Sequence, residues 1–387
     1  MSENLFRPLV TSLMDCGKVL FDCIENALGF KTLDFKKFFV EVALCNKSKE
    51  YPELDNIYYE EYFDRYSFKC PVGITCEDFE KISSKMAHFM GIDENNMKIK
   101  RNKYNVDIKV LVRKPNPVYD PSVHKIKGFK VPIGLDLDTL KIRYWDLEDA
   151  ANAHAYAAGG TRCGKSTLIR LISTLLVQKS PSDIQMSLIN IKRVDLNEFE
   201  GCKNVIHYTE EENEANNILV ENVEEMNRRY LKFSKFKGVK NIWNYREKIE
   251  KMPIRIIVIE EIAGFEKNRE FHETLRLIAQ QGAGAGIFLL IATQLPNKDV
   301  LPNLTKQNIN TVFGGKCKDS IRSDIVIEDG ELHKLRGKGH MKVFDAYDFG
   351  TEIQVFWIDD DMVDSITNQR KRKEALIAAN ISASNKK

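Results

Sequence analysis

Eight consecutive residues have the spacing G-x-x-x-x-G-K-[S/T] of a loop that binds the phosphates of a nucleotide. They are Gly159, Gly160, Thr161, Arg162, Cys163, Gly164, Lys165 and Ser166. An apolar run at 155–158 predicts a strand before the loop, and a helical pattern continues through Thr167 to about residue 178. The glycines allow the backbone to curl so that successive N–H groups face an anion, and a helix N-terminus adds a partial positive charge. The segment is therefore predicted to bind a nucleoside triphosphate.

Side chains for the chemistry of such a site stand at three places in the sequence. Lys165 is predicted to reach the β- and γ-phosphates, and the Ser166 hydroxyl to ligate Mg²⁺. The run 255–259 reads as a buried strand that ends in two carboxylates. Of these, Glu260 is predicted to hold Mg²⁺ through water and Glu261 to position or deprotonate the attacking water. Gln294 follows another apolar strand, where it either senses the γ-phosphate or only caps the strand.

The elements that must position these residues alternate between continuous apolar strands and amphipathic helices. Strands are expected at 184–191, Ile254–Ile259, 287–292 and 310–313, and helices at 215–233 and 272–281. Such alternation predicts an α/β fold with a mainly parallel sheet that is buried on both faces. In such a sheet the carboxyl ends of the strands face the ligand, so both acids are expected beside the phosphates.

The sequence before this region predicts a smaller unit. Residues 1–45 show helical spacing, and the acidic, tyrosine-rich segment 46–65 reads as an exposed connector. A strand at 66–71, a helix at 76–90 and two strands within 97–112 predict a small α+β domain over 46–125. Its cations could touch phosphates, but a solvated hairpin face is the favoured interpretation for Lys98, Lys100, Arg101 and Lys103.

The large domain is predicted over 126–345, and 346–387 is expected to form a strand and a polar basic tail. The tail includes the cluster 370–373, for which a solvated helix end is favoured over a contact with a phosphate backbone.

Composition limits the class of protein. Among 387 residues, 43% are hydrophobic and 29% charged, which is typical of globular proteins, and the net charge of +2 does not by itself indicate nucleic-acid binding. The eight cysteines form no C-x-x-C pair, which argues against a zinc site and a disulfide framework and indicates a cytoplasmic location. The uncharged run 277–297 contains glutamines, glycines and a proline, so helix, turn and strand explain it better than a membrane span.

Several further segments resemble the FtsK/SpoIIIE family of DNA-translocating ATPases, in order over roughly 130–345. Residues 154–167 resemble its histidine-led first motif, and 189–196 (I-N-I-K-R-V-D-L) its I-D-P-K-x-x-E-L segment. Residues 225–230 with 238–245 resemble E-M-x-R-R-Y … V-R-N-I-x-x-Y-N, and 285–296 resemble A-G-I-H … A-T-Q-R-P. The segments 299–309 and 335–341 carry the likeness to about residue 345.

The resemblance implies a RecA-like P-loop ATPase, with ATP and Mg²⁺ as cofactors, that forms a homo-oligomeric ring, a hexamer, around double-stranded DNA. It also implies an arginine supplied by a neighbouring subunit, for which Arg322 is the first candidate and Arg276 the second. DNA would be held without base reading, and the candidates for this contact are Lys232, Lys235, Lys237 and Lys240, although a solvated helix end explains each of them equally well.

The chain departs from the family pattern at several positions. Glu260 stands where Asp is usual, Asn190 and Leu295 replace an Asp and an Arg, and Ala283 stands where many members have Arg. A short motor with a small α+β module is similar to the FtsK-type proteins of conjugative elements, whose partners are membrane-bound transfer-channel proteins. The alternatives are a protein-export ATPase of the type VII secretion kind and a nucleotide-binding scaffold that does not hydrolyse ATP.

Overall fold

The chain divides into two compact units, residues 1–116 and 117–387. The computed structural model describes residues 33–60, 62–113 and 117–371. The boundary lies at the proline-containing segment around 114–117, somewhat before the predicted start of the large domain at 126. The helical pattern predicted before residue 33 lies outside the described residues.

The first unit is a four-stranded antiparallel sheet in the order β1-β2-β4-β3, packed against short helices. Its strands are β1 (Glu53–Tyr59), β2 (Phe63–Lys69), β3 (Met97–Asn102) and β4 (Asn105–Leu111). Its helices are α3 (Phe35–Glu41), α4 (Cys76–Lys81) and α5 (Ser83–Met90). Buried aromatic rings, including Phe39, Phe68 and Phe79, join sheet and helices in one core.

Three features of this unit differ from the sequence prediction. The expected connector 46–65 contains β1 and the start of β2, so it is part of the sheet. The expected helix 76–90 is interrupted at Ile82, which ends α4 and precedes α5. Helix α3 packs in the core of the small unit, so residues 33–45 are not a separate segment.

The second unit is built on a ten-stranded sheet. In spatial order its strands are β6 (Ile142–Asp146), β5 (Lys130–Asp136), β14 (Phe349–Val355), β13 (His340–Phe344), β12 (Thr311–Gly315), β7 (Ala155–Ala158), β11 (Ile287–Thr293), β10 (Ile254–Ile259), β8 (Ile184–Ile189) and β9 (Val205–Thr209). The six strands from β12 to β9 are parallel, and the other four are joined to them and to each other in antiparallel fashion. The predicted α/β class, with a small α+β domain before it, is confirmed.

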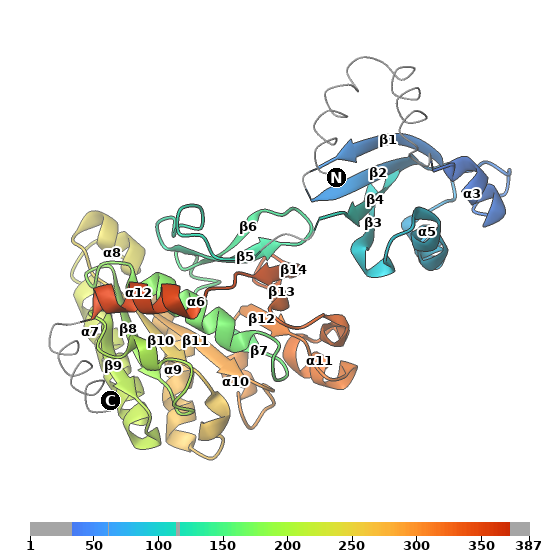
Figure 1. The fold of residues 1–387 in the computed structure, drawn as a ribbon. Coiled ribbons are helices and arrows are strands. Elements are labelled where there is room, and N and C mark those ends of the chain that lie inside the picture. The colour runs from blue at the N-terminus through green and yellow to red at the C-terminus, as the bar shows by residue number, and fades with distance from the viewer. Residues whose placement is uncertain (1–32, 61, 114–116, 372–387) are drawn as a thin grey trace. The chain divides into compact units, whose positions relative to one another are not determined.

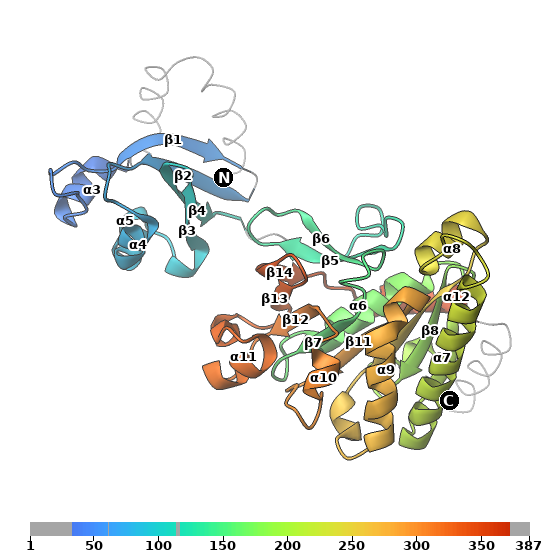
Figure 2. The same cartoon turned by 180° about the vertical axis from the view of Figure 1, so that it is seen from behind.

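Helices cover both faces of the parallel strands. They are α6 (Lys165–Val177), α7 (Glu212–Phe233), α8 (Ile242–Lys248), α9 (Arg269–Ala285), α10 (Asn303–Lys306), α11 (Ser320–Ile327) and α12 (Asp360–Arg370). Helices α6 and α12 lie on the face seen in Figure 1, and α7 and α9 on the face seen in Figure 2. The run 277–297 forms the end of α9 and β11, as predicted, and no helix among the described residues is long and apolar enough to cross a bilayer.

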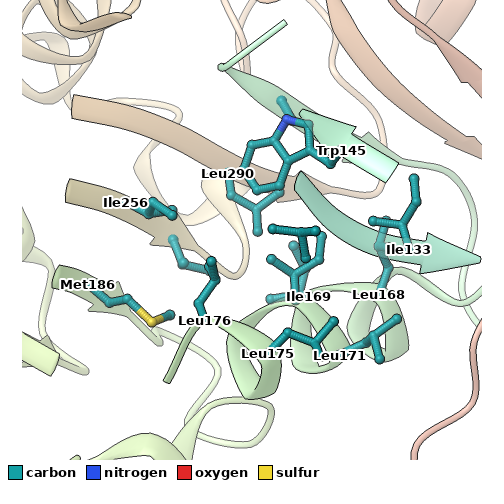
Figure 3. Packing of buried hydrophobic residues seen from close by; sticks show 14 of the residues in the cluster. Ile133, Trp145, Leu168, Ile169, Leu171, Leu175, Leu176, Met186, Ile256 and Leu290 are labelled. Atoms are coloured by element: carbon teal, nitrogen blue, oxygen red, sulfur yellow. The ribbon is translucent and has the colours of Figure 1, made fainter. Parts of the chain in front are cut away.

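Helix α6 is the most deeply buried helix of the second unit. Its side chains from Leu168 to Leu176 pack under β10, β11 and the β5–β6 hairpin, where Ile256, Leu290 and Trp145 meet them (Figure 3). Burial of a Leu or Ile side chain contributes about 1.5–3 kcal/mol, so this contact fixes the helix firmly. The phosphate-binding loop at its start is therefore held on a rigid support.

The segment after residue 345 is part of the second unit. Strand β14 pairs with β13 and β5 inside the sheet, and α12 packs on α6. At the start of the expected solvated tail, Thr367 is fully buried and Arg370 Nη2 donates to the carbonyl of Gln178 at 2.6 Å. The end of α12 is thus docked, whereas 372 and 373 of the basic cluster lie outside the described residues.

A buried histidine makes the second unit sensitive to acid. His154 Nδ1 accepts a hydrogen bond from the Leu289 amide at 3.1 Å, and Nε2 is buried without a partner. Burial lowers the pKa of His154 to about 4, below the 6.5 of an unfolded chain. The unfolded state therefore binds a proton between these values while the folded state does not, so stability falls as pH drops below 6.5.

We predict that His154→Asn removes much of this acid sensitivity, because the Asn oxygen can accept from Leu289 but does not titrate. Between pH 7 and pH 5 the unaltered chain should lose about 2 kcal/mol more unfolding free energy than the variant. Urea titrations followed by tryptophan fluorescence measure this, since Trp145, Trp243 and Trp357 all lie in the second unit. Equal losses in both proteins would contradict the prediction.

Candidate nucleotide-binding site

The phosphate-binding loop is clamped between two other loops of the same unit. The Gly160 amide donates to the Lys316 carbonyl at 2.8 Å, and the Gly339 amide donates to the Cys163 carbonyl at 2.8 Å. Gly164 has φ +111° and lies so close to Gly339 that a Cβ there would be 2.6 Å from the Gly339 Cα. Glycine at 164 is thus required both by the backbone angle and by the close approach.

Lys165 and Ser166 stand at the start of α6, as the sequence predicts. The Lys165 ammonium turns back onto the loop and donates to the carbonyls of Gly159 at 2.6 Å and Gly160 at 3.1 Å. The Ser166 hydroxyl donates to Asp195 Oδ2 at 2.6 Å. Both groups carry donors that suit phosphate oxygens, and the first turn of α6 adds its own N–H groups.

The two predicted acids arrive beside this loop because of strand register. Ile259 of β10 is level with Ile291 of β11, which is level with Tyr156 of β7. Glu260 and Glu261 therefore follow β10 at the level where the loop follows β7. Two strand spacings, or about 10 Å, separate β10 from β7. A triphosphate with its metal ion spans a gap of this size.

Lys192, which had no predicted role, lies between the acids. Its ammonium is 3.2 Å from Glu260 Oε1 and 3.1 Å from Glu261 Oε2. Its own side chain is 42% exposed, while those of Glu260 and Glu261 are 3% and 10% exposed. The lysine thus compensates two largely buried negative charges at the edge facing solvent.

Glu260 has an unusual environment for a carboxylate. Burial, together with the nearby Asp195 carboxyl group, raises the pKa of Glu260 to about 7, although Lys192 opposes the shift. Its Oε2 atom is buried without a hydrogen-bond partner. Two carboxyl groups, one with an unused oxygen, and the Ser166 hydroxyl provide the hard oxygen ligands that Mg²⁺ prefers.

Glu260, Asp195 and Ser166 suit a Mg²⁺ ion whose other ligands are phosphate oxygens and water. Within the described residues no group of three or more acidic, histidine or cysteine side chains could hold a metal ion alone. Mg²⁺ commonly binds through one or two carboxylates plus substrate phosphates, so the residues present are sufficient.

Comparison with known proteins shows which family part of the chain resembles. Residues 123–263 match the model of the FtsK/SpoIIIE family. The chain is 33% identical over 277 residues to the DNA translocase FtsK of Caldanaerobacter subterraneus subsp. tengcongensis, covering 68% of this chain and 38% of that protein. It is 27% identical over 267 residues to the FtsK of Lactococcus lactis, covering 64% of this chain and 34% of that one. The matched segment of this chain is of the FtsK/SpoIIIE family.

Solved structures share the fold. The pCW3 conjugation coupling protein TcpA, solved with ATPγS, superposes with a TM-score of 0.60 at 23% identity, covering 86% of this chain and 97% of TcpA. ATPases 2 and 3 of EssC from Geobacillus thermodenitrificans give a TM-score of 0.58 at 18% identity, covering 66% and 50% of the two chains. The chain spans about a third of the length of the curated FtsK relatives it matches.

The remaining predicted site residues of this FtsK/SpoIIIE-type unit fall into two groups. Gln294 directly follows β11, the strand between the loop strand β7 and the acid strand β10, and its side chain is exposed there. Arg322 lies in the first turn of α11 and pairs with Asp319 of its own chain, and Arg276 on α9 hydrogen-bonds Gln280. The structure thus brings Gln294 to the site, while both arginines have partners on their own helices, and their role toward a neighbouring subunit stays a prediction.

The predicted DNA-binding lysines are not equivalent. Lys232 forms an ion pair with Glu250 at 2.5 Å and lies 5.2 Å from the Tyr245 ring centre, which favours a structural role. Lys235, Lys237 and Lys240 are exposed on the turn between α7 and α8. In the small unit, Lys98, Lys100 and Arg101 lie on β3, one of the two edge strands of the sheet, and Lys103 lies in the turn after it.

The structure adds Lys192 and Asp195, which have no predicted role, to the surroundings of the acids and Ser166. Both follow β8, whose last residue Ile189 pairs with Ile259, so they project at the same sheet edge as the acids. Their position in the sequence could have indicated this, because polar side chains just after a buried parallel strand lie at the edge of the sheet where ligands bind.

We predict that Lys192→Met destabilises the FtsK/SpoIIIE-type unit by about 1–2 kcal/mol at pH 8, because it leaves two buried carboxylates uncompensated. The cost should shrink at pH 5.5, which is below the pKa of about 7 to which burial raises Glu260. Arg193→Met is the matched control, since the ion pairs of Arg193 with Glu210 and Glu211 lie nearer the surface. Urea titrations at both pH values measure the effect, and a pH-independent cost would contradict the charge argument.

Proposed function

We propose that this protein hydrolyses ATP and uses the energy to move double-stranded DNA. One observation carries the proposal: within an FtsK/SpoIIIE-family segment, the loop with Lys165 and Ser166 follows β7 and the acids Glu260 and Glu261 follow β10, and only β11 lies between these strands. A phosphate loop, a metal ligand and a water-positioning acid are the parts that triphosphate hydrolysis needs. Each residue keeps the role that the sequence predicts, with ATP as substrate and Mg²⁺ as cofactor.

The mechanism follows from where these groups lie. Lys165 leaves the loop carbonyls to contact the β- and γ-phosphates. Ser166 and Glu260 would hold the metal ion, which would supply positive charge to the phosphate oxygens. Glu261 orients water for attack on the γ-phosphorus. Gln294 directly follows β11, the strand between loop and acid, where it can respond to loss of the γ-phosphate.

The mechanical part of the proposal rests on the relatives. The curated matches are DNA translocases named FtsK, and TcpA is a conjugation coupling protein by its title. We propose a hexameric ring that grips the phosphate backbone without reading bases and feeds DNA toward a membrane-bound transfer channel from the cytoplasmic side. Arg322 of a neighbouring subunit completes each ATP site in this arrangement.

The test is the ATPase rate with long duplex DNA, single-stranded DNA and no DNA. The rate should rise severalfold with long duplex and fall steeply with salt, because phosphate contacts release counterions. A particle size measured by light scattering under the same conditions reports ring formation. An ATPase rate that is indifferent to DNA would contradict the DNA part of the proposal.

A protein-export ATPase is the second candidate, since structures of EssC and of Thermomonospora curvata EccC share the fold. One of those EccC structures contains a signal sequence peptide. Stimulation of the ATPase by a secreted peptide and not by DNA would favour export. A scaffold without hydrolysis is disfavoured because Glu261 lies beside the loop.

A further inference from the structure

A hollow beside the phosphate loop lies on the side away from the acids. It has a volume of about 440 Å³ and extends from residues 162–167 to Gly339, Gln354, Val355 and Trp357. Neither Glu260 nor Glu261 lines it. If the triphosphate points from the loop toward the acids, as the proposed function requires, we expect the nucleoside on the opposite side of the loop, where this hollow lies.

We propose that the far end of this hollow binds the adenine base, with Trp357 as the stacking surface and Gln354 as the group that selects the base. This deepens the proposed function and rests on it. Neither residue belongs to the phosphate-binding motif or to the matched segment 123–263.

Trp357 is placed for stacking by backbone hydrogen bonds. Its amide donates to the Pro117 carbonyl at 2.6 Å, and the Tyr119 amide donates to the Trp357 carbonyl at 2.7 Å. The residue is nevertheless 53% exposed, which leaves a large apolar surface in water at the rim of the hollow. A base stacked on an aromatic side chain gains about 1–3 kcal/mol.

Gln354 has a fixed amide orientation. Its Nε2 donates to the Lys338 carbonyl at 2.9 Å, and a carbonyl oxygen can only accept, so the nitrogen must stay on that side. The amide oxygen is then available as an acceptor. Adenine carries an amino group at C6, whereas guanine carries an acceptor oxygen there. The fixed amide therefore favours adenine.

The base subsite and the phosphate loop are joined by short hydrogen bonds. The Val355 amide donates to Gly339 at 2.9 Å, and Gly339 and Lys338 in turn donate to the carbonyls of Cys163 and Arg162 at 2.8 and 3.2 Å. One continuous set of backbone contacts thus sets the distance between base and phosphates. Binding of the base in this place positions the triphosphate at the loop.

The experiment measures equilibrium binding of ATP, GTP and inorganic tripolyphosphate, a probe that has no base, to the full chain and its variants. Trp357→Ala should weaken ATP binding about tenfold and leave tripolyphosphate binding unchanged, while Trp357→Phe should keep most of the affinity. Gln354→Met should reduce the preference for ATP over GTP severalfold. Phe349→Ala is the matched control, because this exposed aromatic residue lies on the same strand as Gln354 and does not line the hollow.

Two results would overturn the base subsite while the proposed function survives. One is unchanged ATP affinity in Trp357→Ala, and the other is an equal loss of ATP and tripolyphosphate binding, which would mean that Trp357 only supports the loop. In steady-state assays the subsite predicts a raised KM for ATP with an unchanged kcat. Failure of the unaltered chain to bind either ATP or tripolyphosphate would overturn the proposed function itself, and the subsite with it.

Discussion

Glu261→Gln should bind ATP with nearly unchanged affinity and hydrolyse it at least about 100-fold more slowly, since positioned acid–base groups contribute about 10²–10⁴-fold. Glu261 precedes a short 3-10 helix, and its side-chain oxygen accepts a hydrogen bond from the Ala263 amide. Glutamine has the same shape as glutamate and keeps an oxygen for this bond. Only the ability to polarise water is lost. Binding titrations and single-turnover hydrolysis measure the two quantities separately.

Glu260→Gln is the matched control, because this neighbouring acid is predicted to act through the metal ion. It should raise the Mg²⁺ concentration needed for half-maximal rate more than it lowers the rate at saturating Mg²⁺. If Glu261→Gln hydrolyses ATP normally and Glu260→Gln does not, the water-positioning role belongs to Glu260.

Lys165→Ala should abolish measurable turnover and weaken ATP binding by a large factor. The variant removes the one side-chain ammonium of the loop, which otherwise moves from the Gly159 and Gly160 carbonyls to the phosphates. The fold should persist, because the loop remains anchored through Lys316 and Gly339. Equilibrium binding and steady-state phosphate release are the measurements.

Lys203→Ala is the control for Lys165→Ala, because it removes an exposed cation of the same unit that lies outside the loop and the hollow. It should retain most of the turnover. Normal hydrolysis by Lys165→Ala would show that the triphosphate is not bound at this loop.

The parts predicted best from the sequence are those whose signal is local. The loop, its helix and the acid pair are each encoded within a few residues, and the apolar runs of β10 and β11 are fully buried as their composition requires. Strand register then brings the loop and the acids to the same edge of the sheet. This is expected, because ligands bind at the carboxyl ends of the strands in parallel sheets.

The parts missed lack a local signal. Strand β1 has almost every residue exposed, so it shows no apolar alternation and reads as a connector. Strand β14 lies in the segment 346–387, where the sequence predicts a strand, and it pairs with the neighbouring β13. Its second partner, β5, lies more than two hundred residues earlier in the chain, and no short pattern encodes that contact. Gln354 lies beside the loop because β14 also pairs with β13, and Trp357 is held there by backbone hydrogen bonds with Pro117 and Tyr119.

The most direct test of the central claim is displacement of a third strand from a DNA triplex by the purified protein and ATP. The account predicts ATP-dependent displacement when the triplex lies far along a duplex, and none with Glu261→Gln, although that variant still binds ATP. Hydrolysis at full rate on the same duplex without any displacement would contradict the claim that the site drives movement along DNA.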